Sequence, residues 1–415
     1  MAGRLAIRSL YTGKLRDPGG DANGARIEPQ SDGTTTYNAP PRMRTLRLST
    51  ATRTRLPACL VLAHVLAACG VSTVDGPIVI DPPPQPDPPA LFVARGLVDA
   101  TVVGLVQTDD QIFAGTDRGI YRLQRDDQWV RTTPEHWSVL SVETLGGGRL
   151  IASVETEPNK HELVESLDSG LSWNILTHDF GGPAIGLPRE PVQRLRFDHH
   201  SGDLLATGYG VLARSRDWGR SWAILDGAWG RVGTGLGGLS TAMAGQYIWY
   251  GGQGAIEDPV LIRYQRSGDQ SEDLSEPIEA LLPRPSTVES IRFYPTSEST
   301  VFVTGEGGVV RSMDSGASWE PALVNSTSRF YFDLLIDDRT GYIYTAGWDK
   351  NFTDPQPLIL EVSNDSGLTW STYQHQDPGL RGGVWSMAFV ALDGRRRLFL
   401  GLQGGGVYEV DLQVL

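Results

Sequence analysis

Four copies of one short segment place a carboxylate beside hydroxyl groups, a combination that could serve acid–base chemistry. Each copy follows the pattern S-x-D-x-G-x-x-W, which we call the box. A catalytic carboxylate must stand with its partners around one substrate, so the placement of the copies decides how they are interpreted. The boxes are Ser166, Asp168, Gly170 and Trp173; Ser215, Asp217, Gly219 and Trp222; Ser312, Asp314, Gly316 and Trp319; and Ser363, Asp365, Gly367 and Trp370.

The spacing of the boxes reveals an internal repeat. Successive box aspartates are 49, 97 and 51 residues apart, which corresponds to a period near 50 with one double interval. This period is typical of a four-stranded propeller blade. The apolar strand pattern that precedes each box recurs without a complete box at 102–129, 239–264 and 384–410, so we count seven units. We therefore predict an all-β, seven-bladed propeller of four-stranded antiparallel blades over residues 90–415.

The last unit has only three strand patterns, whereas an additional strand pattern at 90–96 precedes the first unit. We expect this N-terminal segment to supply the fourth strand of the seventh blade. That arrangement would close the ring and leave no unpaired sheet edge at the junction.

In this fold the box has a structural explanation. It lies between the third and fourth strands of a blade, where glycine can take the left-handed conformation of a turn. The Ser and Asp side chains would accept hydrogen bonds from turn amides, and the Trp would be buried between blades. Four equivalent sites spread around a ring cannot converge on one substrate. We therefore interpret the boxes as structural and not catalytic.

The box resembles the Asp-box, or BNR repeat, of sialidases, sortilin-type receptors, xyloglucanases and photosystem II assembly-factor-like propellers. This resemblance covers about residues 90–415 and implies the fold more strongly than the function, because one propeller fold serves many functions. It also implies that the binding face lies opposite the boxes. That face is built by the loops between strands two and three and by the loops between blades.

The strand register places a set of basic, aromatic and acidic residues on this binding face. Guanidinium groups bind carboxylates through paired hydrogen bonds, and arginine with tryptophan is typical of binding hot spots. We therefore expect the face to bind an acidic protein partner or a carboxylated glycan. The candidates are Arg189, Arg231, Arg329, Arg381, Trp137, Trp229 and Trp385 from the inter-blade loops, and Tyr209, Glu306 and Asp349 from the loops between strands two and three.

A glycoside hydrolase of sialidase-like type is the alternative. Such an enzyme needs two carboxylates at a defined separation, and Glu306 could pair with Asp349 or Asp117. The resemblance to sialidases would also imply three substrate-binding arginines, a Tyr nucleophile paired with Glu, and an Arg-Ile-Pro motif. The chain lacks that motif, and sialidase propellers usually have six blades. A non-catalytic binding role is the better interpretation, and we expect no catalytic residue.

The remaining motifs indicate no cofactor or metal. The segment Asp198-His199-His200-Ser201-Gly202-Asp203 contains metal-ligating residue types, but it occupies the position of a hairpin turn in other units. No phosphate-binding loop or Cys metal spacing is present. Residues 1–68 carry 10 Lys and Arg against 4 Asp and Glu, whereas the whole chain has a net charge of −13, so the remainder is strongly acidic. This charge argues against nucleic acid as a partner.

The N-terminal region resembles a bacterial lipoprotein signal. Four arginines and a 13-residue apolar stretch at 43–68 end in Leu-Ala-Ala before Cys69, the pattern of a lipidation site. Residues 1–42 are then a disordered leader or a misassigned start, and 69–89 form a proline-rich linker. Gly70 after the lipidated Cys favours the outer membrane of a Gram-negative cell envelope. We expect a monomer attached to the membrane through this lipid anchor.

Overall fold

The computed structural model describes residues 90–415 except residue 110 and the segments 183–189, 231–234, 242–244 and 326–328. The predicted leader, signal peptide, lipidation site Cys69 and proline-rich linker lie outside the described residues. Among the residues that are described, no helix has the length and apolar character needed to cross a membrane.

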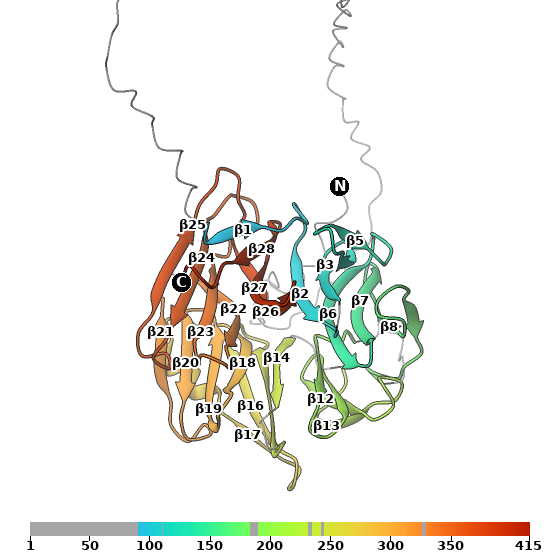
Figure 1. Ribbon diagram of the computed structural model, residues 1–415. Coiled ribbons are helices and arrows are strands. Elements are labelled where there is room, and N and C mark those ends of the chain that lie inside the picture. The colour runs from blue at the N-terminus through green and yellow to red at the C-terminus, as the bar shows by residue number, and fades with distance from the viewer. Residues whose placement is uncertain (1–89, 110, 183–189, 231–234, 242–244, 326–328) are drawn as a thin grey trace, which may run out of the picture. The chain divides into compact units, whose positions relative to one another are not determined.

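The described chain forms seven four-stranded antiparallel sheets, which confirms the predicted seven-bladed propeller (Figure 1). We call the sheets blades 1–7 in the order of their innermost strands along the chain. The strands of each blade are given from the innermost to the outermost. They are β2(Val102–Gln107), β3(Ile112–Thr116), β4(Gly119–Leu123) and β5(Trp129–Arg131); β6(Ser138–Gly146), β7(Arg149–Glu157), β8(Lys160–Ser166) and β9(Asn174–Leu176); β10(Arg194–Asp198), β11(Asp203–Thr207), β12(Val211–Ser215) and β13(Ala223–Gly227); β14(Gly235–Thr241), β15(Tyr247–Gln253), β16(Pro259–Gln265) and β17(Gln270–Asp273); β18(Val288–Tyr294), β19(Ser297–Gly305), β20(Gly308–Ser312) and β21(Glu320–Val324); β22(Phe330–Ile336), β23(Ile343–Trp348), β24(Leu358–Ser363) and β25(Ser371–His375); and β26(Val384–Leu392), β27(Arg395–Leu402), β28(Gly406–Val410) and β1(Phe92–Ala94).

The ring closes as predicted, through the N-terminal strand. β1 pairs antiparallel with β28, with Phe92 opposite Val410 and Ala94 opposite Tyr408. The innermost strands contact one another in the order β2, β6, β10, β14, β18, β22 and β26, and β26 contacts β2. The seventh blade therefore joins the two ends of the described chain.

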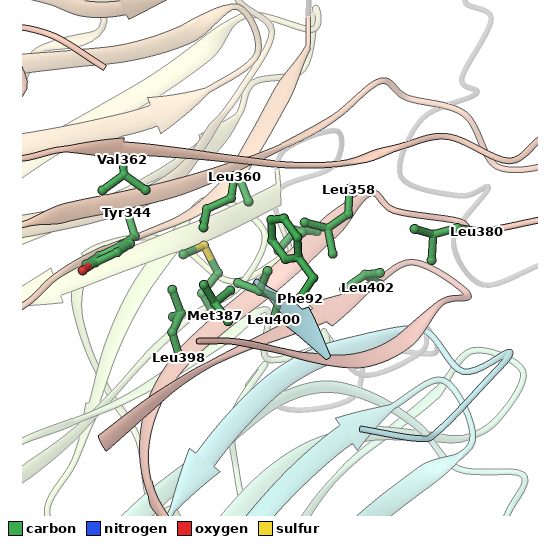
Figure 2. Packing of buried hydrophobic residues seen from close by; sticks show 13 residues of the cluster. Phe92, Tyr344, Leu358, Leu360, Val362, Leu380, Met387, Leu398, Leu400 and Leu402 are labelled. Carbon is green, nitrogen blue, oxygen red and sulfur yellow. The ribbon is translucent and has the colours of Figure 1, made fainter. Parts of the chain in front are cut away.

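The core is divided among the blade interfaces. Each of the seven clusters of buried apolar residues in the described chain lies between two neighbouring blades. At the interface of blades 6 and 7, Phe92 lies with Leu360 and Met387 among side chains from β1, β24 and β26 (Figure 2). Because a blade buries both of its faces, its second strand is buried along most of its length rather than at alternate positions, as in β3 and β11.

Helix α1(Ser275–Leu281) follows β17 in blade 4, where it precedes the loop to blade 5. It places Ile278 in the core cluster between these two blades. The Ser275 hydroxyl accepts a hydrogen bond from the Leu261 amide at 3.0 Å, which ties the start of the helix to β16. This is the only helix in the described part of the chain, and the box-free blade 4 carries it.

Irregularities near the start of the innermost strands direct side chains differently from the rest of the ladder. The register shifts between Val102 and Gly104 in β2, and between Val384 and Ser386 in β26. β-Bulges of this kind re-aim side chains at the rim of a sheet. In β26 the extra residue is Trp385, and in β22 the shift spans Phe332 and Asp333.

Candidate functional site

The strand directions define two faces of the ring. The hairpins between strands one and two and between strands three and four lie on one side, which we call the box face because it carries the four boxes. The loops between strands two and three and the loops between blades lie on the other side, which we call the loop face. In an antiparallel blade these two sets of connections cannot share a side.

Each box closes the hairpin between the third and fourth strands. In the box of blade 5, the Ser312 hydroxyl donates to the Asp314 carboxylate at 2.8 Å and accepts the Gly316 amide at 2.7 Å. Asp314 also accepts the amide and the hydroxyl of Ser318, at 2.8 and 2.5 Å. The other three boxes repeat these bonds with closely similar distances. The hydrogen bonds from the Ser318 hydroxyl and amide lower the pKa of Asp314 to about 2.

The box glycines have two reasons to be glycine. Gly170 has φ +74°, and a Cβ there would lie 2.2 Å from Phe113 of the preceding blade. The equivalent glycines in the other boxes also have positive φ and meet side chains of the preceding blade, such as Trp249 for Gly316. The box therefore fixes a turn and also brings that turn against the neighbouring blade.

The box tryptophans pack at the interface with the preceding blade. Trp222 is buried and lies edge-on to Phe180 with the ring centroids 5.3 Å apart. Trp173, Trp319 and Trp370 are partly buried in the equivalent interfaces. The indole N–H of each box tryptophan donates to an oxygen, for example from Trp370 to the Ala322 carbonyl at 3.0 Å.

The predicted arginines of the loop face have different environments. Arg329 is bound by carboxylates, because its Nε donates to Asp349 at 2.7 Å and its Nη1 lies 3.8 Å from Glu361. Arg381 is half-buried, lies along Gly404, and forms no ion pair with any described residue. Arg189 and Arg231 lie outside the described residues.

Sequence reasoning missed one arginine of the loop face. Arg284 is exposed in the loop between blades 4 and 5, at a position equivalent to the other inter-blade arginines. The signal was available, since Leu-Pro-Arg-Pro in this loop ends two residues before an innermost strand begins. The insertion of α1 in blade 4 lengthened the unit and hid the equivalence.

The aromatic residues of the loop face gather at blades 6 and 7. Trp385 stacks on Phe332 with ring centroids 5.0 Å apart and planes inclined by 26°. Trp348 lies edge-on to Trp385 at 5.7 Å, and the exposed Phe352 lies 4.9 Å from Trp348. We call Phe332, Trp348, Phe352 and Trp385 the aromatic cluster. Gly383 lies directly on the Trp348 ring, so the loop that carries Arg381 packs against the cluster.

Two of the three predicted tryptophans do not join this cluster. Trp137 is buried in the core between blades 1 and 2. Trp229 packs on Phe180 with the centroids 4.7 Å apart, at the interface of blades 2 and 3. Both therefore serve the packing of the ring, and Trp385 is the one predicted tryptophan that belongs to the aromatic cluster.

The predicted carboxylates are engaged with neighbouring groups. Glu306 is buried and accepts a hydrogen bond from the Ser286 hydroxyl. Asp349 is bound to Arg329 as described above. Beside Tyr209 the structure shows the buried Glu190, which accepts the Tyr209 amide and the Gly230 amide, the latter at 3.0 Å. Through these two hydrogen bonds Glu190 connects the loops that contain Tyr209 and Gly230, and burial raises its pKa.

One pair has the residue types of a sialidase-like nucleophile, but its environment is unsuited to that role. Burial raises the pKa of Tyr331, and the neighbouring Glu361 raises it further. Tyr331 has no exposed surface. A nucleophile must reach its substrate and has to be activated, whereas both effects here keep the phenol protonated and covered. The geometry gives the glycoside hydrolase alternative no support at this pair.

Charged residues from the innermost strands meet at the centre of the ring. Asp333 accepts the Ser290 hydroxyl at 3.1 Å and an Arg292 Nη2 bond at 2.6 Å, both from blade 5. It also accepts the Met387 amide of blade 7 at 3.2 Å, so one carboxylate connects three blades. Arg194 donates to the Gly237 carbonyl at 2.7 Å, and burial lowers its pKa.

The box face contains a cavity of about 570 Å³ where the innermost strands of blades 1, 2 and 7 end. Leu105, Thr144, His199 and Phe389 are among its lining residues. The segment that contains His199 forms the predicted hairpin turn, with Asp198 opposite Asp203 in the ladder. No group of three or more metal-ligating residues occurs within the described ranges.

Comparison with protein-family models finds no match, and comparison with curated protein sequences finds none either. Among solved structures, YCF48 from Cyanidioschyzon merolae has 14% identity and a TM-score of 0.54 over 79% of this chain and 100% of that one. The chain therefore has the same fold as this solved structure. YCF48 bound to D1 peptide gives the same TM-score with 77% and 95% covered, at 14% identity.

Further similar structures have quite different functions. The extracellular domain of the hybrid two-component system BT4673 from B. thetaiotaomicron has 13% identity and a TM-score of 0.54 over 76% of this chain. This chain spans 38% of that one. The GH74 xyloglucanase from Xanthomonas campestris has 14% identity and the same TM-score, with 77% and 53% covered. At these identities the likeness shows the fold alone.

Proposed function

We propose that this protein is a non-catalytic, lipid-anchored propeller of the bacterial cell envelope that binds an acidic partner on its loop face. The observation that carries the proposal is the position of Arg381. Its guanidinium forms no ion pair with a described carboxylate, and the loop that carries it packs through Gly383 against Trp348 of the aromatic cluster.

The chemistry of this site favours a carboxylate-bearing ligand. A planar guanidinium binds carboxylates through paired hydrogen bonds, and Arg beside Trp is the usual composition of a binding hot spot. The exposed Phe352 offers apolar area at the edge of the cluster. Since Arg329 is neutralised by Asp349, Arg381 and the exposed Arg284 become the principal described arginines for binding, with Arg189 and Arg231 retained as candidates.

The similar structures and the sequence patterns support the wider setting. One similar propeller has been solved with a bound peptide, so the fold is suited to protein partners. The boxes resemble Asp-boxes, and the pattern before Cys69 resembles a lipoprotein signal of the outer membrane. We place the protein in envelope assembly or recognition, with an acidic protein segment or a carboxylated glycan as its ligand.

A binding experiment with defined probes tests the proposal. The propeller is applied to arrays of acidic peptides and carboxylated glycans, each printed beside its neutral counterpart. Arg381→Glu should reduce binding to the acidic probes at least about tenfold, the effect of losing roughly 1.4 kcal/mol or more. Added salt should weaken wild-type binding, because exposed charges are screened.

The matched control is Arg395→Glu, which reverses an exposed arginine on the box face. This variant should bind like the wild type, and both variants should melt at the wild-type temperature. Equal binding by Arg381→Glu and the wild type would refute the site. Cleavage of a glycan probe by the wild type would instead favour the glycoside hydrolase alternative.

A further inference from the structure

The described chain enters the propeller on the box face. β28 runs from the loop face toward Val410, and β1 pairs with it antiparallel from Phe92 onward. Just before β1, the Leu91 carbonyl accepts the Asp411 amide at 2.9 Å, next to the end of β28. After β1, the Gly96 carbonyl accepts the Val407 amide at 2.9 Å near the loop face. The described chain therefore begins at the box face.

The variable positions of the boxes expose apolar side chains on that same face. Leu167 and Leu171 project from the box of blade 2, and Met313 and Leu368 from the boxes of blades 5 and 6. Trp218 in the box of blade 3 is also exposed, although Arg149 lies over its ring at 4.7 Å. These five residues, which we call the apolar tips, are between 39% and 67% exposed. The side chains at these five positions make none of the box hydrogen bonds, which use the fixed Ser, Asp and Gly and the hydroxyl residue before the Trp.

We propose that the box face is the surface that this protein lays against the lipid bilayer. This inference rests on the lipid anchor of the proposed function. Since an extended proline-rich chain advances by about 3.1 Å per residue, a tether of the 20 residues 70–89 would reach at most about 60 Å. The tether delivers the box face to the membrane first, and apolar side chains at the tips of its hairpins can then enter the interfacial layer.

The charge of the box aspartates does not draw the box face to anionic lipid. The box aspartates are ionised at neutral pH, because hydrogen bonds hold the pKa of each at about 2. Attraction to anionic lipid therefore contributes little, and contact would depend on the apolar tips and a zwitterionic surface. This orientation directs Arg381 and the aromatic cluster away from the membrane, where a partner can reach them. The apolar tips and the binding site thus have separate tasks on opposite faces.

Quenching by spin-labelled lipid tests the orientation. The full-length, lipidated protein is reconstituted into phosphatidylcholine vesicles that contain doxyl-labelled lipid, and a fluorophore is attached to one introduced cysteine. The processed chain would carry no other free thiol, since Cys59 lies in the signal peptide and Cys69 would be acylated. The labelled variants are Leu171→Cys and Leu368→Cys on the box face. The control is Ile256→Cys, an exposed apolar residue in a loop between strands two and three.

The two box-face labels should be quenched at least about twofold more than the label at position 256. Combining Leu171→Ser, Met313→Ser and Leu368→Ser should reduce quenching of a label at Leu167→Cys to the level of the control. These side chains are exposed, so the melting temperature should stay unchanged.

The outcomes separate this inference from the proposed function. Flotation with the vesicles but equal quenching on both faces would overturn the orientation and leave the anchor intact. The Cys69→Ser variant should not float with the vesicles. If the wild-type protein does not float either, the anchor and this inference are both overturned. If a box-face label is shielded from water in the absence of vesicles, a second copy or another protein covers the apolar tips. That result would also overturn the proposal.

Discussion

Asp314 shows how completely a carboxylate can be committed to the turn that contains it. Its three hydrogen-bond donors are side-chain or backbone groups of Ser312 and Ser318, within the same box. The same arrangement in all four boxes lowers the pKa of each aspartate to about 2. An aspartate held in this way favours its ionised form and has no role as a proton donor near neutral pH.

This shift predicts a defined loss of stability in acid. An aspartate has a pKa of about 3.9 in an unfolded chain, so the unfolded protein binds the proton first as the pH falls. The stabilisation is therefore complete above about pH 4 and is lost as the pH falls toward 2. Thermal melts at pH 5 and pH 2.5 should show a drop for the wild type. Asp314→Asn should have a lower melting temperature at pH 5 and a smaller drop between the two values.

Glu298→Gln provides the control, because Glu298 is an exposed carboxylate on the box face with no hydrogen bond to a described residue. This variant should keep the full wild-type drop. An Asp314→Asn protein with an unchanged drop would mean that the box aspartates do not cause the acid sensitivity.

At the scale of the element, the box hairpin combines a turn with a blade contact. The repeat in the sequence predicted the turn, because Gly at a fixed position between two strands indicates a left-handed residue. It did not predict that Gly170 lies against Phe113, which depends on how neighbouring blades approach. The same limit applies to the site. The strand register placed Arg329 and Asp349 on one face, but their ion pair depends on side-chain positions in adjoining loops.

Two glycines with the same positive φ can separate the effect of the turn from that of the contact. Gly170 and Gly202 both have φ +74°, but a Cβ on Gly202 would meet nothing within 4 Å. Gly202→Ala should cost about 1–2 kcal/mol, the strain of a left-handed alanine. Gly170→Ala should cost about 1–3 kcal/mol more, because the new methyl group overpacks the contact with Phe113. Urea unfolding of both variants measures the difference, and equal costs would show that the contact is unimportant.

At the scale of the whole molecule, a repeat architecture is easier to predict than its centre. The seven units, their order and the closing strand followed from the period near 50 and from the unmatched strand at 90–96. The central charges did not, because Asp333 and Arg292 come from different units and meet only when the ring forms. Single charged residues within apolar strands were the available signal, and they point to the centre of the ring only once the innermost strands are known.

Ring closure gives the last prediction. β1 covers the outer edge of β28, and Arg95 beside it bonds Glu409 of β28 through Nε at 2.6 Å and Asp127 of blade 1 at 3.0 Å. A chain that begins at Gly96 would lose these bonds, remove Phe92 from the core of blades 6 and 7, and expose a strand edge that can pair with other chains. It should melt at a lower temperature and form oligomers in size-exclusion chromatography. A chain that begins at Ala90 keeps β1 and should behave as the intact propeller. If the chain beginning at Gly96 is as stable and as soluble as the chain beginning at Ala90, the blades hold together without the closing strand, and each interface core is sufficient without it.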